Sequence, residues 1–137
     1  MIVPDKNEIE KLLSLAYEAR SRAYTPYSHF KVGACLKTAA GKHYLGCNIE
    51  NAAYTPTNCA ERTAMFKAVS EGEREFAALA VVWDGEGPAM PCGVCRQVLA
   101  EFCPLDMPVI CGINAGGYKL MTLNELLPGA FLPKDLI

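Results

Sequence analysis

The chain has 137 residues, of which 51% are hydrophobic and 20% charged, so it can fill the core of one domain over residues 1–137. Its formal net charge of −2, without a basic stripe, argues against a nucleic acid as its partner. Residues 1–6 lack a basic region followed by an apolar run, and no run of about 18 apolar residues occurs, so we expect no signal peptide, no membrane span and a cytoplasmic protein.

The predicted elements alternate between helices and strands. Asp5 and Glu8 form a candidate capping box for a first helix, which ends before Pro26, and Thr122 and Glu125 form a second box near the C-terminus. In chain order we expect a helix from residue 5, strands 30–38 and 44–49, helix 59–72, strand 76–83, helix 92–103, strands 109–113 and 118–122, and a short helix that ends before residue 128.

These elements predict a mixed sheet with helices on its faces. Strand 76–83 is apolar without alternation, which is typical of a central strand covered on both sides. Short turns join strand 30–38 to 44–49 and strand 109–113 to 118–122, so each pair should run antiparallel. The helices from 59 and 92 both follow strand ends, at an edge where ligands bind in open α/β folds.

Seven cysteines are many for this length, and their odd number argues against a disulfide framework. A free cysteine in an apolar run behaves as a small hydrophobic residue. We interpret four of them in this way: Cys35, Cys47, Cys103 and Cys111. The other three stand at the starts of predicted helices.

A metal site is predicted at these two helix starts. Cys59 and Glu61 are two residues apart, and residues i and i+2 point to nearly opposite sides of a helix, so they can share a site only at its mouth. Cys92 and Cys95 begin the next helix. Three thiolates can hold one zinc ion and leave a fourth position for water, next to which Glu61 can carry protons.

Three thiolates and one Zn²⁺ together carry a charge of −1, which weakens the metal as a Lewis acid. Two helix N-termini can offset this charge, each with about half a positive charge. Arg62 can offset it further by donating hydrogen bonds to the sulfurs. The alternative is that Arg62 is a cation on the helix surface.

Five stretches resemble the cytidine deaminase family, in its small homotetrameric form, and they span nearly the whole chain. They are 26–34 (PYSHFKVGA), 48–51 (NIEN), 59–64 (CAERTA), 91–98 (PCGVCRQV) and 126–131 (LLPGAF). The resemblance implies a three-layer α/β/α sandwich around a five-stranded mixed sheet, with Zn²⁺ as the cofactor. It implies hydrolytic deamination of cytidine and deoxycytidine to uridine and deoxyuridine plus ammonia, in pyrimidine salvage.

The resemblance also assigns roles to single residues. Cys59, Cys92 and Cys95 would bind zinc, and Glu61 would pass protons from water to N3 and to the departing amino group. Asn48 and Glu50 would bind the ribose 3′-hydroxyl. Phe30 would lie beside the pyrimidine, and the Ala60 backbone N–H would donate to the base carbonyl. Toward a neighbouring subunit, Ala52 and Tyr54 would lie near the 5′-hydroxyl of its ligand, and Phe131 would stack on its pyrimidine.

The residues alone leave simpler interpretations open. Asn48 and Glu50 can be the solvated end of a turn. Phe30 can be a core aromatic and Tyr54 an ordinary loop residue. The apolar C-terminal tail around Phe131 can fold back onto its own core instead of reaching a neighbour.

Three rival functions are also compatible with parts of the sequence. A redox protein would use Cys-x-x-Cys at a helix start, but this leaves Cys59 and Glu61 without a role. Another aminopyrimidine-like molecule, such as a nucleoside antibiotic, could be the substrate of a deaminase. A structural zinc module would need a fourth ligand, for which the candidates are His29, His43, Cys103 and Cys111.

Overall fold

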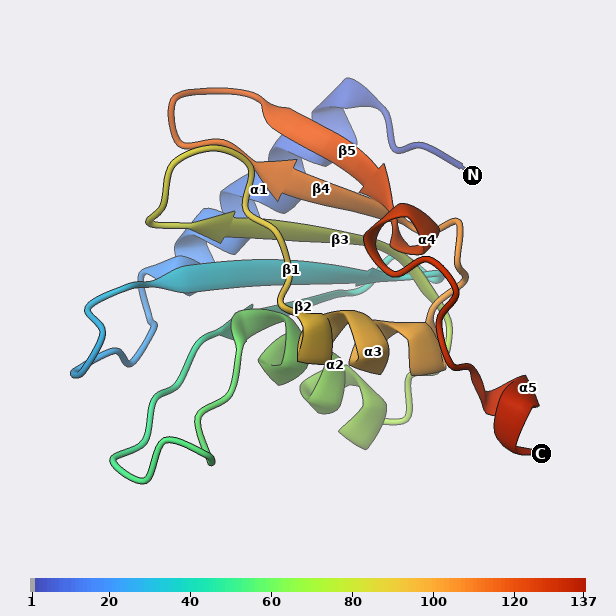
Figure 1. The fold of residues 1–137 in the computed structure, drawn as a ribbon. Coiled ribbons are helices and arrows are strands. Elements are labelled where there is room, and N and C mark those ends of the chain that lie inside the picture. Colours follow the sequence, from blue (N-terminus) through green and yellow to red (C-terminus); the bar gives the residue numbers. More distant parts are fainter. Residues whose placement is uncertain (1) are drawn as a thin grey trace.

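The computed structural model describes residues 2–137, which fold around a five-stranded sheet (Figure 1). The helices are α1 (Lys6–Arg20), α2 (Ala60–Ser70), α3 (Gly93–Phe102), α4 (Leu123–Leu126) and α5 (Pro133–Leu136), and the strands are β1 (Val32–Thr38), β2 (His43–Cys47), β3 (Phe76–Trp83), β4 (Pro108–Gly112) and β5 (Tyr118–Thr122). The strand order is β2-β1-β3-β4-β5, with β3 and β4 parallel and the other neighbours antiparallel. Within residues 2–137, no helix is long and apolar enough to cross a membrane.

Over residues 78–81 of β3, the two faces of the sheet carry side chains of different size. On β3, Ala78 and Ala80 belong to the core under α1, whereas Leu79 and Val81 belong to the core under α2 and α3. Figure 1 shows α1 behind the sheet and α2 with α3 on its other side. The predicted α/β/α sandwich around a mixed sheet is therefore confirmed.

Two glycines bring the helices close to the sheet. A Cβ atom at Gly33 would lie 2.0 Å from the Ala16 carbonyl oxygen of α1, and a Cβ atom at Gly46 would lie 2.2 Å from the Ala60 carbonyl oxygen of α2. Atoms cannot approach so closely, so only glycine fits at these positions. The contact at Gly46 places the first turn of α2 directly against β2.

The structure departs from the predicted elements mainly at their ends. Strand ends differ from the predicted ones by at most two residues, and α5 was not expected. Asp5 accepts the Glu8 backbone N–H at 2.8 Å, but the reciprocal half of the predicted box is wrong because the Glu8 carboxylate pairs with Lys37 of β1 at 2.9 Å. The second box, between Thr122 and Glu125, is complete in both directions.

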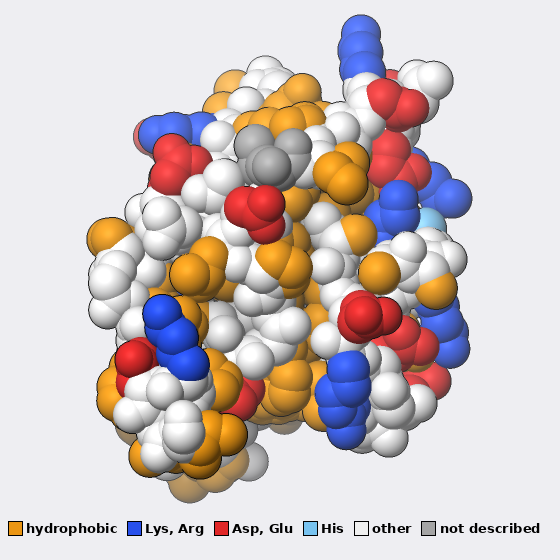
Figure 2. Space-filling model, turned by 90° about the vertical axis from the view of Figure 1, so that its right-hand side faces the viewer, with side chains coloured by type: hydrophobic (Ala, Val, Ile, Leu, Met, Phe, Trp, Pro, Cys, Tyr) orange, Lys and Arg blue, Asp and Glu red, His pale blue; other side chains and the backbone are white. Residues whose placement is uncertain are grey.

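A hollow of about 450 Å³ lies at the end of the sheet where β3 and β4 begin. Figure 2 faces this end and shows hydrophobic side chains gathered over its centre. Its lining is mainly apolar and includes Ile2, Phe76, Met107 and Pro108. None of the three thiols of the predicted metal site lines this hollow, so its size does not mark it as the place of the chemistry.

Candidate active site

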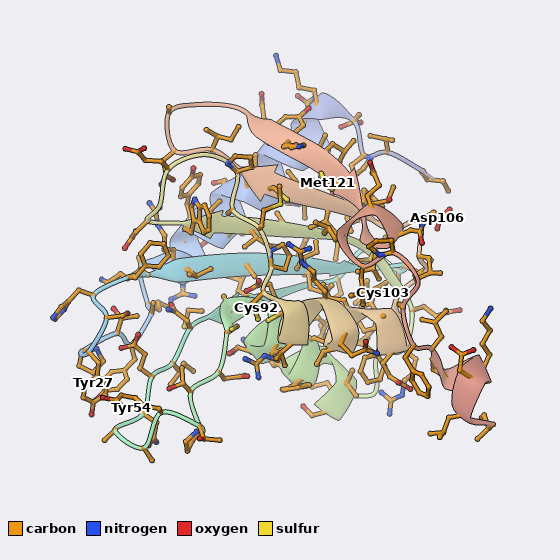
Figure 3. The ribbon with its side chains drawn as sticks, in the orientation of Figure 1. Tyr27, Tyr54, Cys92, Cys103, Asp106 and Met121 are labelled. Carbon is orange, nitrogen blue, oxygen red and sulfur yellow. The ribbon has the colours of Figure 1, made fainter. Side chains whose placement is uncertain are left out.

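The first turns of α2 and α3 carry the predicted metal ligands. Cys59 and Cys92 are the N-cap residues of these helices, both with extended backbone, and the Cys92 sulfur accepts the backbone N–H of Cys95 at 3.5 Å. In the first turn the backbone N–H groups have no intrahelical acceptor, so they present partial positive charge to the sulfurs. Figure 3 shows Cys92 at the start of α3, between that helix and the sheet.

The structure brings the three sulfurs together. The Sγ atoms of Cys59, Cys92 and Cys95 all lie within 4.8 Å of one another, and those of Cys59 and Cys92 are 3.7 Å apart. Tetrahedral zinc with Zn–S bonds of about 2.3 Å sets neighbouring sulfurs about 3.8 Å apart. Cys59 and Cys92 already have this spacing, and Cys95 lies close enough to complete a set of three zinc ligands.

The environment of Cys59 favours the thiolate form of this residue. Hydrogen bonds from the Cys95 thiol and from Arg62 lower the pKa of Cys59 to about 5. Arg62 Nη2 donates to the Cys59 sulfur at 3.2 Å, so the side chain turns toward the cluster and not into solvent. This contact is the one expected of a cation that offsets the charge of the thiolates.

Glu61 is the buried carboxylic acid of the same helix turn. Its side chain and backbone together are only 4% exposed. Burial raises the pKa of the Glu61 carboxyl to about 7, and the nearby Cys59 thiolate adds to this shift. A carboxyl with a pKa near neutrality can both take up and release protons at physiological pH, which suits a proton carrier.

The cluster opens into a pocket of about 170 Å³ at the end of β3. Part of its lining is polar and contains Asn48, Thr57, Asn58 and the first turn of α2. The rest is mainly apolar, and its residues are Val32, Val81, Trp83 and Met90. The sequence did not predict this apolar part of the lining, because every residue of β3 is apolar. Leu79, Val81 and Trp83 share one face of the strand only by their spacing of two residues.

Asn48 lines this pocket and fixes the chain that leads into β1. Its Oδ1 accepts the Val32 backbone N–H at 2.9 Å, and its Nδ2 donates one hydrogen to the Phe30 carbonyl at 2.8 Å. The amide has a second N–H, which remains able to bind a ligand.

Glu50 lies in a neighbouring depression with Tyr27, Ser28 and Tyr54. Its Oε1 accepts the backbone N–H groups of Tyr27 and Ser28 at 3.0 and 3.1 Å, and its Oε2 accepts the Ser28 hydroxyl. The bond from the Ser28 hydroxyl is the main reason that the pKa of Glu50 is lowered, so this carboxylate is charged at neutral pH. Thr57 lines both this depression and the thiol pocket, so the two adjoin.

Of the other predicted substrate contacts, Ala60 lines the thiol pocket, whereas Phe30, Ala52, Tyr54 and Phe131 lie outside its lining. The Phe30 ring packs edge-on against Trp83, with ring centroids 6.0 Å apart. Ala52 and Tyr54 are exposed in the loop before α2, where Figure 3 shows Tyr54 close to Tyr27. Phe131 is 60% exposed in the C-terminal tail. The tail is attached to α3 through the Gln97 side chain, which donates to the Phe131 carbonyl at 2.8 Å.

The three-cysteine cluster distinguishes the proposed catalytic zinc site from a redox pair and from a structural zinc site. Among residues 2–137, Cys59 joins Cys92 and Cys95, and no histidine or further cysteine completes a fourth ligand. A redox pair would not need the third thiol, and a structural zinc site would need a fourth protein ligand. The fold and the site thus define a zinc-dependent enzyme that activates water.

The chain matches known proteins over most of its length. A model of the cytidine and deoxycytidylate deaminase zinc-binding region matches residues 6–111. The chain is 57% identical to a cytidine deaminase of Sporosarcina psychrophila, over 94% of this chain and 95% of that protein, and 53% identical to one of Halalkalibacterium halodurans, over 93% and 96%. A crystal structure of cytidine deaminase from Burkholderia pseudomallei superposes with a TM-score of 0.86 at 48% identity, over 89% of this chain and 98% of that one. The chain belongs to the cytidine and deoxycytidylate deaminase family, and zinc is its metal.

We predict that purified protein contains about one zinc ion per chain by metal analysis. Cys59→Ser should lose the metal on dialysis, because two thiolates remain of the three. Cys47→Ser is the matched control and should keep it, since Cys47 lies outside the cluster. Metal-free protein with a reversible Cys92–Cys95 disulfide would contradict this prediction.

Proposed function

We propose that this chain deaminates cytidine and deoxycytidine to uridine and deoxyuridine, with release of ammonia. The observation that carries the proposal is that the buried carboxyl of Glu61 and the thiols of Cys59 and Cys92 line the same pocket. Family membership supports the same activity. We also propose that residues 1–137 form a single deaminase domain.

Proton transfer is the part of the reaction assigned to Glu61. When bound, zinc supplies Lewis acidity, which lowers the pKa of water from nearly 16 to about 7. The Glu61 carboxylate takes the proton of the attacking water while the water oxygen bonds to C4 of the pyrimidine. The carboxyl passes this proton to N3, and the carboxylate then takes the remaining proton from the new C4 hydroxyl and passes it to the amino group. The C4–N bond breaks as the C4 carbonyl forms, and ammonia leaves.

The ribose is assigned to Asn48 and Glu50. The free N–H of Asn48 can donate to the 3′-oxygen, and Glu50 Oε2, which accepts one bond from Ser28, keeps lone pairs for the 3′-hydroxyl hydrogen. The two side chains also hold the segment around Phe30, so the same residues bind the sugar and position the ring beside the base. The Ala60 backbone N–H, in the first turn of α2, is free to meet the base carbonyl.

A neighbouring subunit would supply the remaining contacts. Phe131, Leu136 and Ile137 are largely exposed at the C-terminus, and an apolar surface of this kind favours burial against another chain. We propose a homotetramer in which Phe131 stacks on the pyrimidine of a nucleoside bound in a neighbouring subunit. Ala52 and Tyr54 would approach the 5′-hydroxyl of that nucleoside.

We further propose that the enzyme works in the cytoplasm in pyrimidine salvage. Its seven cysteines are free, and thiolate ligands persist best in a reducing compartment. A nucleoside deaminase there would recover uracil nucleosides from cytosine nucleosides.

Glu61→Gln tests the proton transfer. The variant should keep its fold and its zinc, because the amide has nearly the shape of the carboxyl and is not a ligand. Its turnover of cytidine should fall by about 10²- to 10⁴-fold, the usual contribution of a general acid–base group. Unchanged turnover, measured by the loss of cytidine absorbance, would refute the role of Glu61.

Mixed tetramers test the role of Phe131 in the neighbouring site. Glu61→Ala subunits lack the proton carrier and keep the ring, whereas Phe131→Ala subunits lack the ring and keep the proton carrier. After joint denaturation and refolding, the two weak variants should regain part of the activity, since a site with Glu61 can use its neighbour's Phe131. If tetramers shown by mass to be mixed are no more active than the sum of the separate variants, Phe131 does not act in trans.

A further inference from the structure

Trp83 is the largest side chain on the apolar side of the catalytic pocket, and it is the single tryptophan of the chain. It ends β3, and it lines the pocket together with Val32, Val81 and Met90. The pocket, at about 170 Å³, is smaller than the roughly 300–1,000 Å³ of most ligand sites, so a few added atoms should decide what enters.

The indole ring is held in place by its surroundings. Its Nε1 donates to the Gly87 carbonyl at 3.2 Å, and the Phe30 ring packs against it at an interplanar angle of 82°. Gly85 covers both rings so closely that a Cβ atom there would lie 3.1 Å from Trp83 and 3.3 Å from Phe30. The ring therefore has little room to move away from the pocket.

The backbone under the ring is equally fixed. The Trp83 carbonyl accepts hydrogen bonds from Arg20 and from Asn114, both at 2.7 Å. Asp84, the next residue, accepts the Lys31 backbone N–H at 2.8 Å. Three segments that are far apart in the sequence thus hold the end of β3, and the wall of the pocket is preorganised.

The orientation of the cytosine base in the pocket follows from the proposed function, on which this inference rests. C4 has to face the thiol cluster, and its ring neighbours are N3 and C5. N3 and the base carbonyl need Glu61 and the Ala60 N–H, which both belong to the first turn of α2. With N3 and the carbonyl assigned to α2, the apolar C5 edge is left to the apolar lining residues Val81, Trp83 and Met90.

We propose that Trp83 is a specificity-determining residue, which limits the substrates to cytosine nucleosides without a substituent at C5. A group attached to C5 would have to occupy space that the indole ring fills. Added or missing atoms of methylene size in an apolar pocket change kcat/KM by about 10- to 200-fold, so the effect should be measurable.

The activity test compares cytidine with 5-methylcytidine and 5-iodocytidine. Trp83→Phe and Trp83→Ala should each raise kcat/KM for the substituted nucleosides relative to cytidine, by about 10-fold or more for the smaller side chain. Tyr118→Ala, which removes a half-exposed ring from β5, is the matched control and should leave the ratio unchanged. A ratio within twofold of that of the unchanged chain in both Trp83 variants would overturn the proposal.

A binding test is independent of turnover and of the variants' folding. Because the only tryptophan lines the pocket, uridine should change the tryptophan emission of the unchanged enzyme in a saturable way. Uridine binding shown by equilibrium dialysis with no change in emission would overturn the placement of Trp83. No deamination of any of these nucleosides by zinc-loaded protein would instead overturn the proposed function, so the two failures are distinguishable.

Discussion

Three sulfurs within 4.8 Å of one another concentrate negative charge, and the site depends on how the fold offsets it. The N-termini of α2 and α3 both point toward the cluster, and Arg62 donates to Cys59 at 3.2 Å. A bound zinc ion would neutralise most of the negative charge of the sulfurs, because three thiolates and Zn²⁺ together carry a charge of −1. A site so nearly neutral can place the ionisable Glu61 beside the metal, where burial raises its pKa toward neutrality.

The packing of the sheet fixes this arrangement in space. Gly46 allows the first turn of α2 to touch β2, and the larger side chains of β3 fill the space under α2 and α3. The last of these side chains, Trp83, reaches beyond the core into the pocket. The core on this face and the apolar wall of the active site are therefore one continuous structure, and a change in β3 affects both.

The sequence predicted those features that depend on local residue patterns. Both helix starts with their thiols, the two antiparallel hairpins and the central position of β3 are confirmed. It did not predict the ion pair of Glu8 with Lys37, because that partner lies on another element. The apolar wall was missed because both faces of β3 are apolar. Over residues 78–81 only the size of the side chain alternates, small under α1 and larger under α2, and hydrophobicity alone does not reveal this.

The most direct measurement of the central claim is an absorbance assay of zinc-loaded protein with cytidine, deoxycytidine, cytosine and CMP side by side. Cytidine and deoxycytidine should react, because both carry the 3′-hydroxyl assigned to Asn48 and Glu50. Cytosine lacks the sugar, and the phosphate of CMP would approach the charged Glu50 carboxylate, so both should react poorly. A preference for CMP, or no reaction with either nucleoside, would contradict this account of the site.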